Sequence, residues 1–350
     1  MIIDSFSHIY PQEYVQGLKS LASNISITVE NKSGYSVLAN RNSGDFVGGF
    51  FKADTGFIDP KVRLEHMEKY GVDTQILTIG MPGVNLSHYR EVSDRNLLSL
   101  SRIANDSLSH LSERFPEKFY GVAEVPILTK ENFGQALDEI DRSIKDLGLR
   151  GIQLYTLSAG LPLEDELLTQ VYKKAVKYDI PILLHPTNLP GDGYNSYQRE
   201  YKLNIIFGWP FETSIAMSRL AFSGTFDRFP DLKILTHHLG GMIPYFAGRY
   251  MLHFQKPFEN SITVNKRPVE EYIKRMFHDT AVYGNISALL GGYSFFGGEH
   301  ILFGTDYPFG PDEGEKFLKV TVESIKEMHL PHGDEEKIFF KNAQNLFKIR

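Results

Sequence analysis

Metal-capable side chains recur at the ends of apolar, strand-like runs in this chain of 350 residues. His8, His185, the pair His237-His238 and Asp306 each stand at or near the end of such a run. If these runs are parallel strands of one β/α barrel, their carboxyl ends converge on one mouth. Neutral imidazoles and a carboxylate suit Zn²⁺ and other borderline divalent ions, and a site with few protein ligands leaves positions for water and substrate. The pattern therefore predicts a catalytic metal centre.

Other polar and aromatic side chains have both a structural and a functional interpretation. His278 lies within a run and fits the core and the site equally well. Trp209 and Tyr307 lie beside the long fifth loop and a strand end, where they can stack on a planar substrate, although core packing is the more usual role of such residues. Arg249 follows Pro244 in a helical pattern, as a solvated charge or as a fork for a substrate carboxylate.

Eight apolar runs alternate with helical patterns, which predicts an α/β fold, a (β/α)8 TIM barrel. The runs are Met1 to His8, Thr74 to Gly80, Phe119 to Pro126, Arg150 to Tyr155, Pro181 to His185, Leu232 to His238, Met276 to Val282 and His300 to Asp306. The clearest helical patterns are Ser93 to Phe115, Asn132 to Leu147 and Glu164 to Tyr178. An open, doubly wound sheet is the alternative, but it predicts a glycine-rich loop after the first strand, where the chain reads Ser7-His8-Ile9-Tyr10-Pro11.

Two segments fall outside the βα repeat. Residues from about 17 to 55 are polar and contain glycine, and the stretch from Thr187 to Gly208 is a long loop after the fifth run. Long βα loops on a barrel usually shape the substrate pocket. We expect one domain over residues 1–350, with an insertion at about 17–55.

Composition restricts the class of protein. The formal charge is −6, hydrophobic residues make up 42% and charged residues 23%, and Lys and Arg form no block of the kind that binds nucleic acid. The chain has no Cys, so a metal must bind to His, carboxylate and water. The first residues lack the pattern of a secretory signal, and no run is long enough to span a bilayer. We expect a cytoplasmic protein with no nucleic-acid or membrane partner.

Several spaced motifs resemble one family. They are Asp4-x-x-x-His8 with Pro11, Arg63-Leu64-x-x-Met67-x-x-x-Gly71-Val72-Asp73, Ile182-Leu183-Leu184-His185-Pro186, Gly208-Trp209-Pro210-Phe211-Glu212-Thr213, Ser223-Gly224 through Phe229-Pro230-Asp231-Leu232-Lys233, Thr236-His237-His238-Leu239-Gly240-Gly241-x-x-Pro244 with Arg249, and Phe303-Gly304-Thr305-Asp306-Tyr307-Pro308. Over nearly its whole length the chain resembles the amidohydrolase-related proteins of the amidohydrolase superfamily, typified by aminocarboxymuconate semialdehyde decarboxylase and the γ-resorcylate and 5-carboxyvanillate decarboxylases.

The resemblance implies roles for individual residues. His8, His185 and Asp306 match metal ligands, His238 matches the acid/base after strand six, and Arg249 matches a carboxylate binder. The spacing to Pro244 selects His238 over His237. In some relatives the matching arginine reaches the neighbouring subunit's pocket, which implies a homodimer. The segment at about 17–55 resembles the small insertion of the decarboxylases.

The chain departs from the family pattern at its first strand. The usual His-x-His or Glu-x-His reads Phe6-Ser7-His8 here, and Phe6 cannot coordinate a metal. Three interpretations follow: a water or substrate oxygen completes the shell, which we favour; His238 moves into the shell; or the metal site is degenerate.

The resemblance predicts a metal-dependent, non-oxidative decarboxylase of a small planar carboxylic acid, aromatic or unsaturated. Phe6, Trp209, Tyr307 and Arg249 are the candidate substrate-binding residues, and His238 and Asp306 the catalytic ones. One divalent metal is expected, with Zn favoured and Mn or Mg open. Hydrolysis of an amide, ester, lactone or C–C bond by a metal-bound water is the alternative. A metal-poor barrel that binds a carboxylated ligand without turnover is the third hypothesis.

Overall fold

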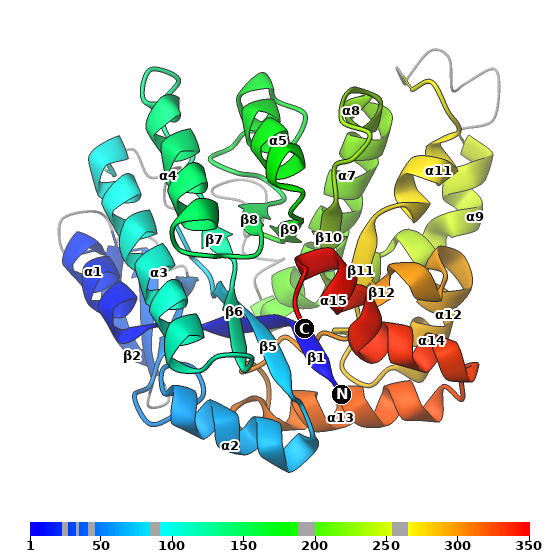
Figure 1. Cartoon of the computed structure of the whole chain (residues 1–350), viewed down its shortest axis with the longest axis horizontal. Helices are drawn as coiled ribbons and strands as arrows, with labels where there is room; N and C mark the ends of the chain where they lie inside the picture. The colour runs from blue at the N-terminus through cyan, green and yellow to red at the C-terminus, as the bar shows by residue number, and fades with distance from the viewer. Residues whose placement is uncertain (23–26, 33–34, 41–45, 85–91, 188–199, 254–264) are drawn as a thin grey trace. The chain divides into compact units, whose positions relative to one another are not determined.

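A computed structural model describes residues 1–22, 27–32, 35–40, 46–84, 92–187, 200–253 and 265–350 (Figure 1). Contacts within the chain divide it into two compact units. The first unit holds Met1–Gln153, Thr305–Val320 and Arg350, and the second holds Leu154–Gly304 and Thr321–Ile349. The expectation of one domain over residues 1–350 stays a prediction.

The first unit is built on parallel strands. Its strands are β1 (Ile3–Ile9), β5 (Thr74–Ile79), β6 (Phe119–Gly121) and β7 (Ala123–Glu124), with β8 (Ile152–Tyr155) running across the division between the units. β1, β5 and β6 pair in that order, all parallel. Every residue of β1 and β5 is buried, as their apolar runs predict for strands covered on both faces.

The predicted insertion contains a small antiparallel sheet. Its strands β2 (Ile27–Lys32), β3 (Tyr35–Asn40) and β4 (Phe46–Phe51) pair in chain order. The sheet follows helix α1 (Gln12–Ala22), which packs against α3 (Asp94–Arg114). The segment between the first two barrel strands is therefore a separate piece of β structure.

Helix α2 (Pro60–Tyr70) connects this sheet to β5 and has clear end signals. The Asp59 side chain accepts a hydrogen bond from Lys61 N, Pro60 occupies the first turn, and Gly71 closes the helix at φ 72°. The helix buries Arg63 and Met67, so a guanidinium lies in the interior of the first unit.

The second unit continues the alternation of parallel strands and helices. Strands β9 (Ile182–His185), β10 (Ile234–Thr236), β11 (Phe277–Asp279) and β12 (Ile301–Leu302) are adjacent in that order and parallel. Leu184 lies opposite Thr236, and Thr236 lies opposite His278. All eight predicted runs therefore contain strands, several shorter than expected.

Helices complete both units, and the predicted helical patterns are confirmed. The remaining elements are α4 (Phe133–Lys145), α5 (Glu166–Tyr178), η2 (Glu200–Lys202), η3 (Asn204–Gly208), α7 (Trp209–Phe222), α8 (Thr225–Arg228), η4 (His238–Gly240), α9 (Ile243–His253), α11 (Val269–Lys274), α12 (Ile286–Phe296), η5 (Gly298–His300), η6 (Asp312–Gly314), α13 (Glu315–Glu327), α14 (His332–Glu336), η7 (Lys337–Lys341) and α15 (Asn342–Phe347). Of the loop from Thr187 to Gly208, residues 188–199 lie outside the described residues.

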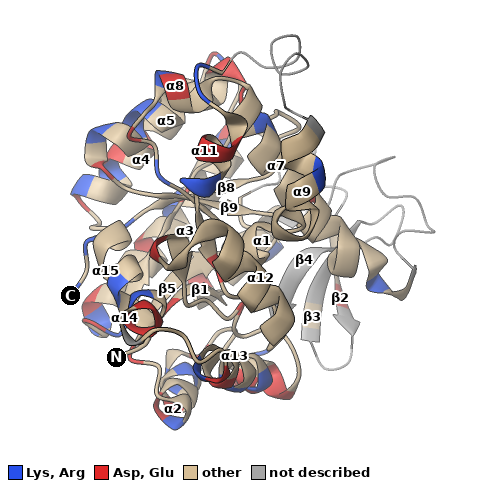
Figure 2. Cartoon of the chain, turned by 90° about the vertical axis from the view of Figure 1, so that its right-hand side faces the viewer, with Lys and Arg blue, Asp and Glu red and all other residues tan. Residues whose placement is uncertain are grey.

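The surface charge is mixed. Figure 2 shows acidic and basic residues interspersed along α2 and α13, as their sequences require. Among the described helices none is both long enough and apolar enough to cross a bilayer.

Candidate metal centre

His8 and Asp306 lie together in the first unit. The His8 Nε2 atom is 3.2 Å from Asp306 Oδ1, and both side chains are buried. On the other side of the ring, His8 Nδ1 lies 2.8 Å from the Thr78 hydroxyl, which itself donates to the Ser7 carbonyl. Thr78 therefore accepts from Nδ1, and the lone pair of a neutral His8 is on Nε2.

This arrangement fits a cation. In the neutral tautomer assigned above, Nε2 and a carboxylate oxygen are both acceptors, and two acceptors 3.2 Å apart repel each other unless a proton or metal ion lies between them. Imidazole nitrogen and carboxylate oxygen are a donor set that binds Zn²⁺ and related divalent ions. The pair therefore has the chemistry of two metal ligands.

Asp306 is held by the first strand. Its backbone is left-handed, at φ 63°, and its N–H donates to the Phe6 carbonyl at 2.9 Å. Its neighbour Thr305 donates twice to Asp4, from the backbone N at 3.0 Å and from Oγ1 at 2.6 Å. A conformation that is uncommon outside glycine persists because these bonds hold Thr305 and Asp306 against the first strand.

A buried polar network lies behind this pair. Arg63 is fully buried, and it donates to Gln75 Oε1 at 2.8 Å and to the His8 carbonyl, while Gln75 donates to Asp4 at 3.2 Å. Burial raises the pKa of Asp4 to about 7, against the lowering effect of its hydrogen bonds from Thr305, Phe6 and Gln75. Burial lowers the pKa of Arg63 to about 10, so the guanidinium is charged at neutral pH. The network joins the backbones beside both candidate ligands.

Aromatic rings surround His8. Phe6 is fully buried, and its ring meets the His8 ring edge to face with centres 4.7 Å apart; Phe309 does the same at 5.5 Å. The Tyr307 hydroxyl lies 2.8 Å from His66 Nδ1, and Arg63 covers its ring at 4.7 Å. Phe6 and Tyr307 both pack beside the candidate ligands, and their predicted contact with substrate stays a prediction.

The second unit presents a row of three polar side chains. His185, His237 and Asp279 follow the paired residues of β9, β10 and β11 by one position, and all three are buried. His237 Nδ1 lies 2.7 Å from Asp279 Oδ2, and His185 Nδ1 lies 2.6 Å from the Pro186 carbonyl. The centres of the two imidazole rings are 5.8 Å apart.

His238 leaves the strand in a different direction from His237. Its backbone is left-handed at φ 55°, and its N–H donates to Asp279 Oδ1 at 2.9 Å. Its ring stacks on Trp209, with centres 6.3 Å apart and planes 29° apart, and Tyr283 lies edge-on at 6.2 Å. Trp209 also meets the His185 ring at 6.1 Å. A predicted acid/base and a predicted stacking residue are thus neighbours.

Two further candidates are placed elsewhere. His278 is a core residue: its Nδ1 bonds to Thr236 Oγ1 at 2.7 Å, and its ring stacks on Phe296 at 3.6 Å. Burial lowers its pKa well below the usual value. Arg249 lies on α9 with an exposed side chain.

The predicted ligand set draws on both units. Within the described residues, no three His, Asp or Glu side chains form a group that could hold one metal ion. His8, His185 and Asp306 as a single ligand set therefore stay a prediction.

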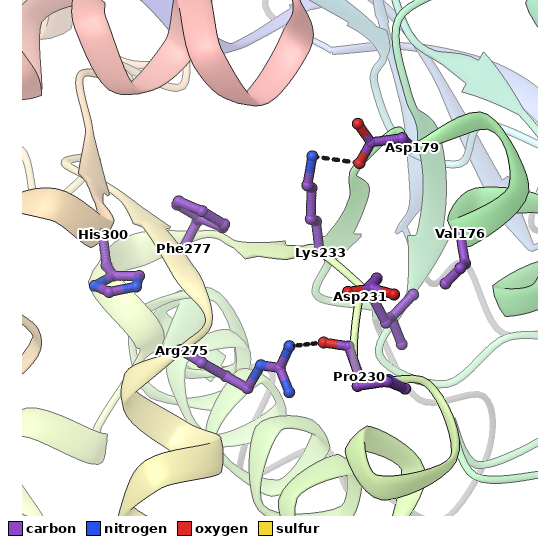
Figure 3. Close-up of a pocket in the computed structure, with 9 residues that line it drawn as sticks. Val176, Asp179, Pro230, Asp231, Lys233, Arg275, Phe277 and His300 are labelled. Atoms are coloured by element: carbon purple, nitrogen blue, oxygen red, sulfur yellow. Dashed lines mark hydrogen bonds and ion pairs between the residues drawn. The ribbon is translucent and has the colours of Figure 1, made fainter.

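A cavity of about 560 Å³ in the second unit is a different feature (Figure 3). Its lining includes Asp179, Lys233, Arg275 and His300, which precede strands β9, β10, β11 and β12 in that order. These are the amino ends of the strands, and the candidate ligands lie at the carboxyl ends.

Three residues with clear contacts were missed or left unassigned in the sequence. Asp279 directly follows His278 in the chain and has no role in the sequence pattern, and Arg63 and Asp4 occur in it only as parts of motifs. Asp279 lies in the middle of the seventh predicted run, Met276 to Val282, and only the structure ends strand β11 at this residue, so its position in the sequence did not mark it as a strand-end side chain.

Comparison with known proteins identifies the family. Residues 35–349 match the amidohydrolase family model Amidohydro_2. The chain belongs to this family. It is 30% identical over 281 residues to 2-amino-3-carboxymuconate-6-semialdehyde decarboxylase of Dictyostelium discoideum, covering 80% of this chain and 75% of that protein.

Solved structures of two decarboxylases share the fold of this chain. The structure of 5-carboxyvanillate decarboxylase from Sphingomonas paucimobilis superposes with a TM-score of 0.80 at 23% identity, covering 100% of this chain and 99% of that one. A dihydroxybenzoic acid decarboxylase from Polaromonas sp. JS666, with bound manganese and the inhibitor 2-nitroresorcinol, has a TM-score of 0.75 at 24% identity, covering 99% and 96%. The predicted family and α/β TIM-barrel class are confirmed.

Proposed function

We propose that the chain is a metal-dependent, non-oxidative decarboxylase of a small planar carboxylic acid, aromatic or unsaturated. The observation that carries the proposal is the similarity over 80% of the chain to a protein that decarboxylates an unsaturated carboxylic acid. The acceptor pair of His8 and Asp306 supports it, because a non-oxidative decarboxylase of this family needs a place for a cation.

His8, His185 and Asp306 would hold one divalent metal. We propose Zn as the metal, with Mn or Mg as alternatives. The manganese in the related Polaromonas structure supports a divalent ion but does not distinguish among these three metals. A divalent metal supplies Lewis-acid stabilisation of negative charge on a substrate oxygen. Because Phe6 is buried against His8, we propose that oxygen from water or substrate completes the shell.

His238 would deliver the proton. The bond between the substrate carbon and its carboxyl group breaks, CO2 leaves, and the carbon that keeps the electron pair takes a proton from the imidazole. Trp209, stacked on His238, would pack against the substrate plane, with Phe6 and Tyr307 as further contacts. These roles are consistent with the burial of His238 next to an indole ring.

We further propose a cytoplasmic homodimer in which Arg249 binds the substrate carboxylate of the partner's site. The exposure of Arg249 on α9 supports this arrangement, as does the exposure of Tyr245, Phe246 and Leu252 on the same helix. Light scattering of the purified protein tests the dimer, and a monomer at micromolar concentration would contradict it. Subcellular fractionation tests the location, and we expect no binding to nucleic acid or membranes.

The first test combines metal content with product analysis. Elemental analysis of protein purified without chelator should give about one divalent metal per chain, and a screen of aromatic and unsaturated carboxylic acids should find one that releases CO2. His238→Asn should abolish turnover and leave the metal content unchanged. Incorporation of oxygen from labelled water into the product would instead establish hydrolysis and refute the decarboxylase.

Phe6→His tests the interpretation of the first strand. If the missing ligand weakens the site, this variant should retain more metal through dialysis than the parent protein. Equal retention in both proteins would mean that Phe6 does not limit metal binding.

A further inference from the structure

Tyr283 is an aromatic neighbour of His238 that the roles proposed above do not use. It lies between β11 and α12, and its ring meets the His238 ring edge to face with centres 6.2 Å apart. Trp209 stacks on the same imidazole with centres 6.3 Å apart. All three side chains belong to the second unit. The predicted acid/base is therefore in contact with two aromatic rings of its own unit.

We propose that Tyr283 is a specificity-determining residue, and that its ring contacts the planar part of a carboxylic acid bound at His238. With Trp209 it forms an aromatic wall, which favours a flat acid over a saturated ring of the same size. The inference rests on the proposed function, because it takes the surroundings of His238 as the substrate site.

Much of the Tyr283 side chain is exposed. The residue is 41% exposed, although its ring touches an imidazole that is 8% exposed. Tyr155 meets the His185 ring in a similar way, at 5.9 Å, but is only 4% exposed, so packing accounts for its ring. Packing accounts for only part of the Tyr283 ring, and the exposed part lies next to the imidazole that is predicted to move a proton.

One carboxylate holds Tyr283 in place relative to His238. Asp279 Oδ1 accepts hydrogen bonds from the backbone N–H groups of His238 and Ala281, each at 2.9 Å. On the other side of Tyr283, the Asn285 side chain accepts a hydrogen bond from the first turn of α12 at 3.1 Å. The turn that carries Tyr283 is thus fixed at both ends, and binding requires little further ordering of its backbone.

The backbone of Tyr283 indicates that its side chain has a function. Its φ is 53°, a left-handed conformation that is uncommon for a bulky aromatic residue and costs free energy. Glycine adopts this conformation without a clash of its side chain, and the chain has glycine at the next position, Gly284. Strained residues of this kind cluster at binding and catalytic sites, where the side chain is kept for its contacts with a ligand.

The chemistry of the two rings favours a planar ligand. Aromatic rings contact other π-systems in stacked or edge-to-face arrangements, which are worth about threefold to tenfold in binding beyond the effect of the buried area. A saturated ring of the same carbon number buries a similar area but has no π-system. Trp209 and Tyr283 together should therefore distinguish a flat acid from a puckered one.

The test measures binding by the fluorescence of Trp209, the single Trp of the chain. Benzoate and cyclohexanecarboxylate are the probes, because both carry a carboxylate on a carbocyclic ring of equal size and only benzoate is planar. Both are titrated into protein purified without chelator. In the parent protein, benzoate should change the fluorescence and bind at least about threefold more tightly than cyclohexanecarboxylate.

Tyr283→Gly removes the ring and should fold, because glycine suits the left-handed backbone. It should weaken benzoate binding by about threefold to tenfold and cyclohexanecarboxylate binding by less. Tyr283→Phe, which keeps the ring, should restore the preference for benzoate. The control is Tyr178→Ala at the end of α5, where the ring lies under Lys177 at 5.0 Å. This control should leave both affinities within about twofold of the parent.

An unchanged preference for benzoate in Tyr283→Gly would overturn the proposal. An equal loss for both acids would also overturn it, because Tyr283 would then only support the fold of the site. No response of the Trp209 fluorescence to benzoate in the parent would overturn it as well. If Tyr283→Gly does not fold, as judged by circular dichroism, Tyr283→Asn replaces it with the same expected and contrary results, because Asn also tolerates a left-handed backbone.

The result is separate from the decarboxylase proposal, since fluorescence measures binding and not turnover. Failure of every carboxylic acid to release CO2 would refute that function and leave the preference for benzoate to decide the role of Tyr283.

Discussion

Replacing Arg63 by Met should strongly destabilise the first unit. The guanidinium is fully buried, donates to Gln75 Oε1 and to the His8 carbonyl, and covers the Tyr307 ring at 4.7 Å. Methionine fills most of the same volume and has no donor. The change therefore removes the hydrogen bonds and the charge while keeping most of the packing.

The size of the effect follows from the groups left behind. Each of the two buried oxygen acceptors, on Gln75 and on His8, loses a donor, at about 1–3 kcal/mol each. Loss of the cation over the Tyr307 ring adds about 1 kcal/mol. The desolvation penalty of the buried guanidinium is removed with the charge, which offsets part of these losses. We expect a loss of about 4 kcal/mol in the free energy of unfolding, a large part of the 5–15 kcal/mol typical of a domain.

Urea unfolding followed by circular dichroism measures this loss. Arg102→Met is the matched control, because the Arg102 side chain is 52% exposed and makes an ion pair of 3.3 Å with Glu139. The control should lose less than about 1 kcal/mol. A loss for Arg63→Met no greater than that of the control would refute the reasoning that the buried hydrogen bonds of Arg63 hold the first unit together.

Three further predictions concern the backbone and two buried carboxylates. Gly241→Ala should lower the thermal stability by at least about 2 kcal/mol, because Gly241 has φ 65° and a Cβ there would lie 2.3 Å from the Pro210 carbonyl oxygen; an unchanged melting temperature would contradict this. Burial raises the pKa of Asp4 to about 7, so the folded state favours the protonated carboxyl. The contribution of Asp4 to the free energy of unfolding is therefore fully present below about pH 4 and is lost as the pH rises through about 7, by roughly 4 kcal/mol in total. The advantage of the parent over Asp4→Asn in urea unfolding should therefore shrink from pH 5 to pH 8, and a constant difference would argue against a raised pKa. For Glu139, burial is outweighed by hydrogen bonds, chiefly from Arg142, which hold its pKa below the usual value. The contribution of Glu139 to the free energy of unfolding is present above the usual carboxylate pKa and is lost as the pH falls through the lowered pKa. Glu139→Gln should therefore make the free energy of unfolding less sensitive to acid. The same loss of stability at low pH in the parent and the variant would show that the Glu139–Arg142 pair does not contribute to this pH dependence.

The strand pattern was predictable because it depends on local sequence. The run from Thr74 to Gly80 became β5 almost unchanged, since a strand buried on both faces is apolar throughout. Strand lengths were less predictable: the run from Leu232 to His238 contains only three residues of β10. His237 and His238 leave the strand there, and this exit gives the two histidines different neighbours.

The core or site role of His278 could not be decided from the sequence. Its face depends on the register of β10 against β11, which places it beside Thr236 and under Phe296. A shift of one residue would have exchanged His278 and Asp279. The same register made Asp279 the partner of His237, a role that the sequence pattern did not assign.

By itself, the sequence determined the order of strands and helices and the type of side chain at each strand end, because apolar periodicity and motif spacing are local properties. Tertiary structure alone decided which ring nitrogen carries the hydrogen in His8 and His237. His8 is oriented by Thr78, 70 residues away, and His237 by Asp279, 42 residues away. A ring nitrogen is assigned by the group that bonds to its opposite side, and that group is supplied by another strand.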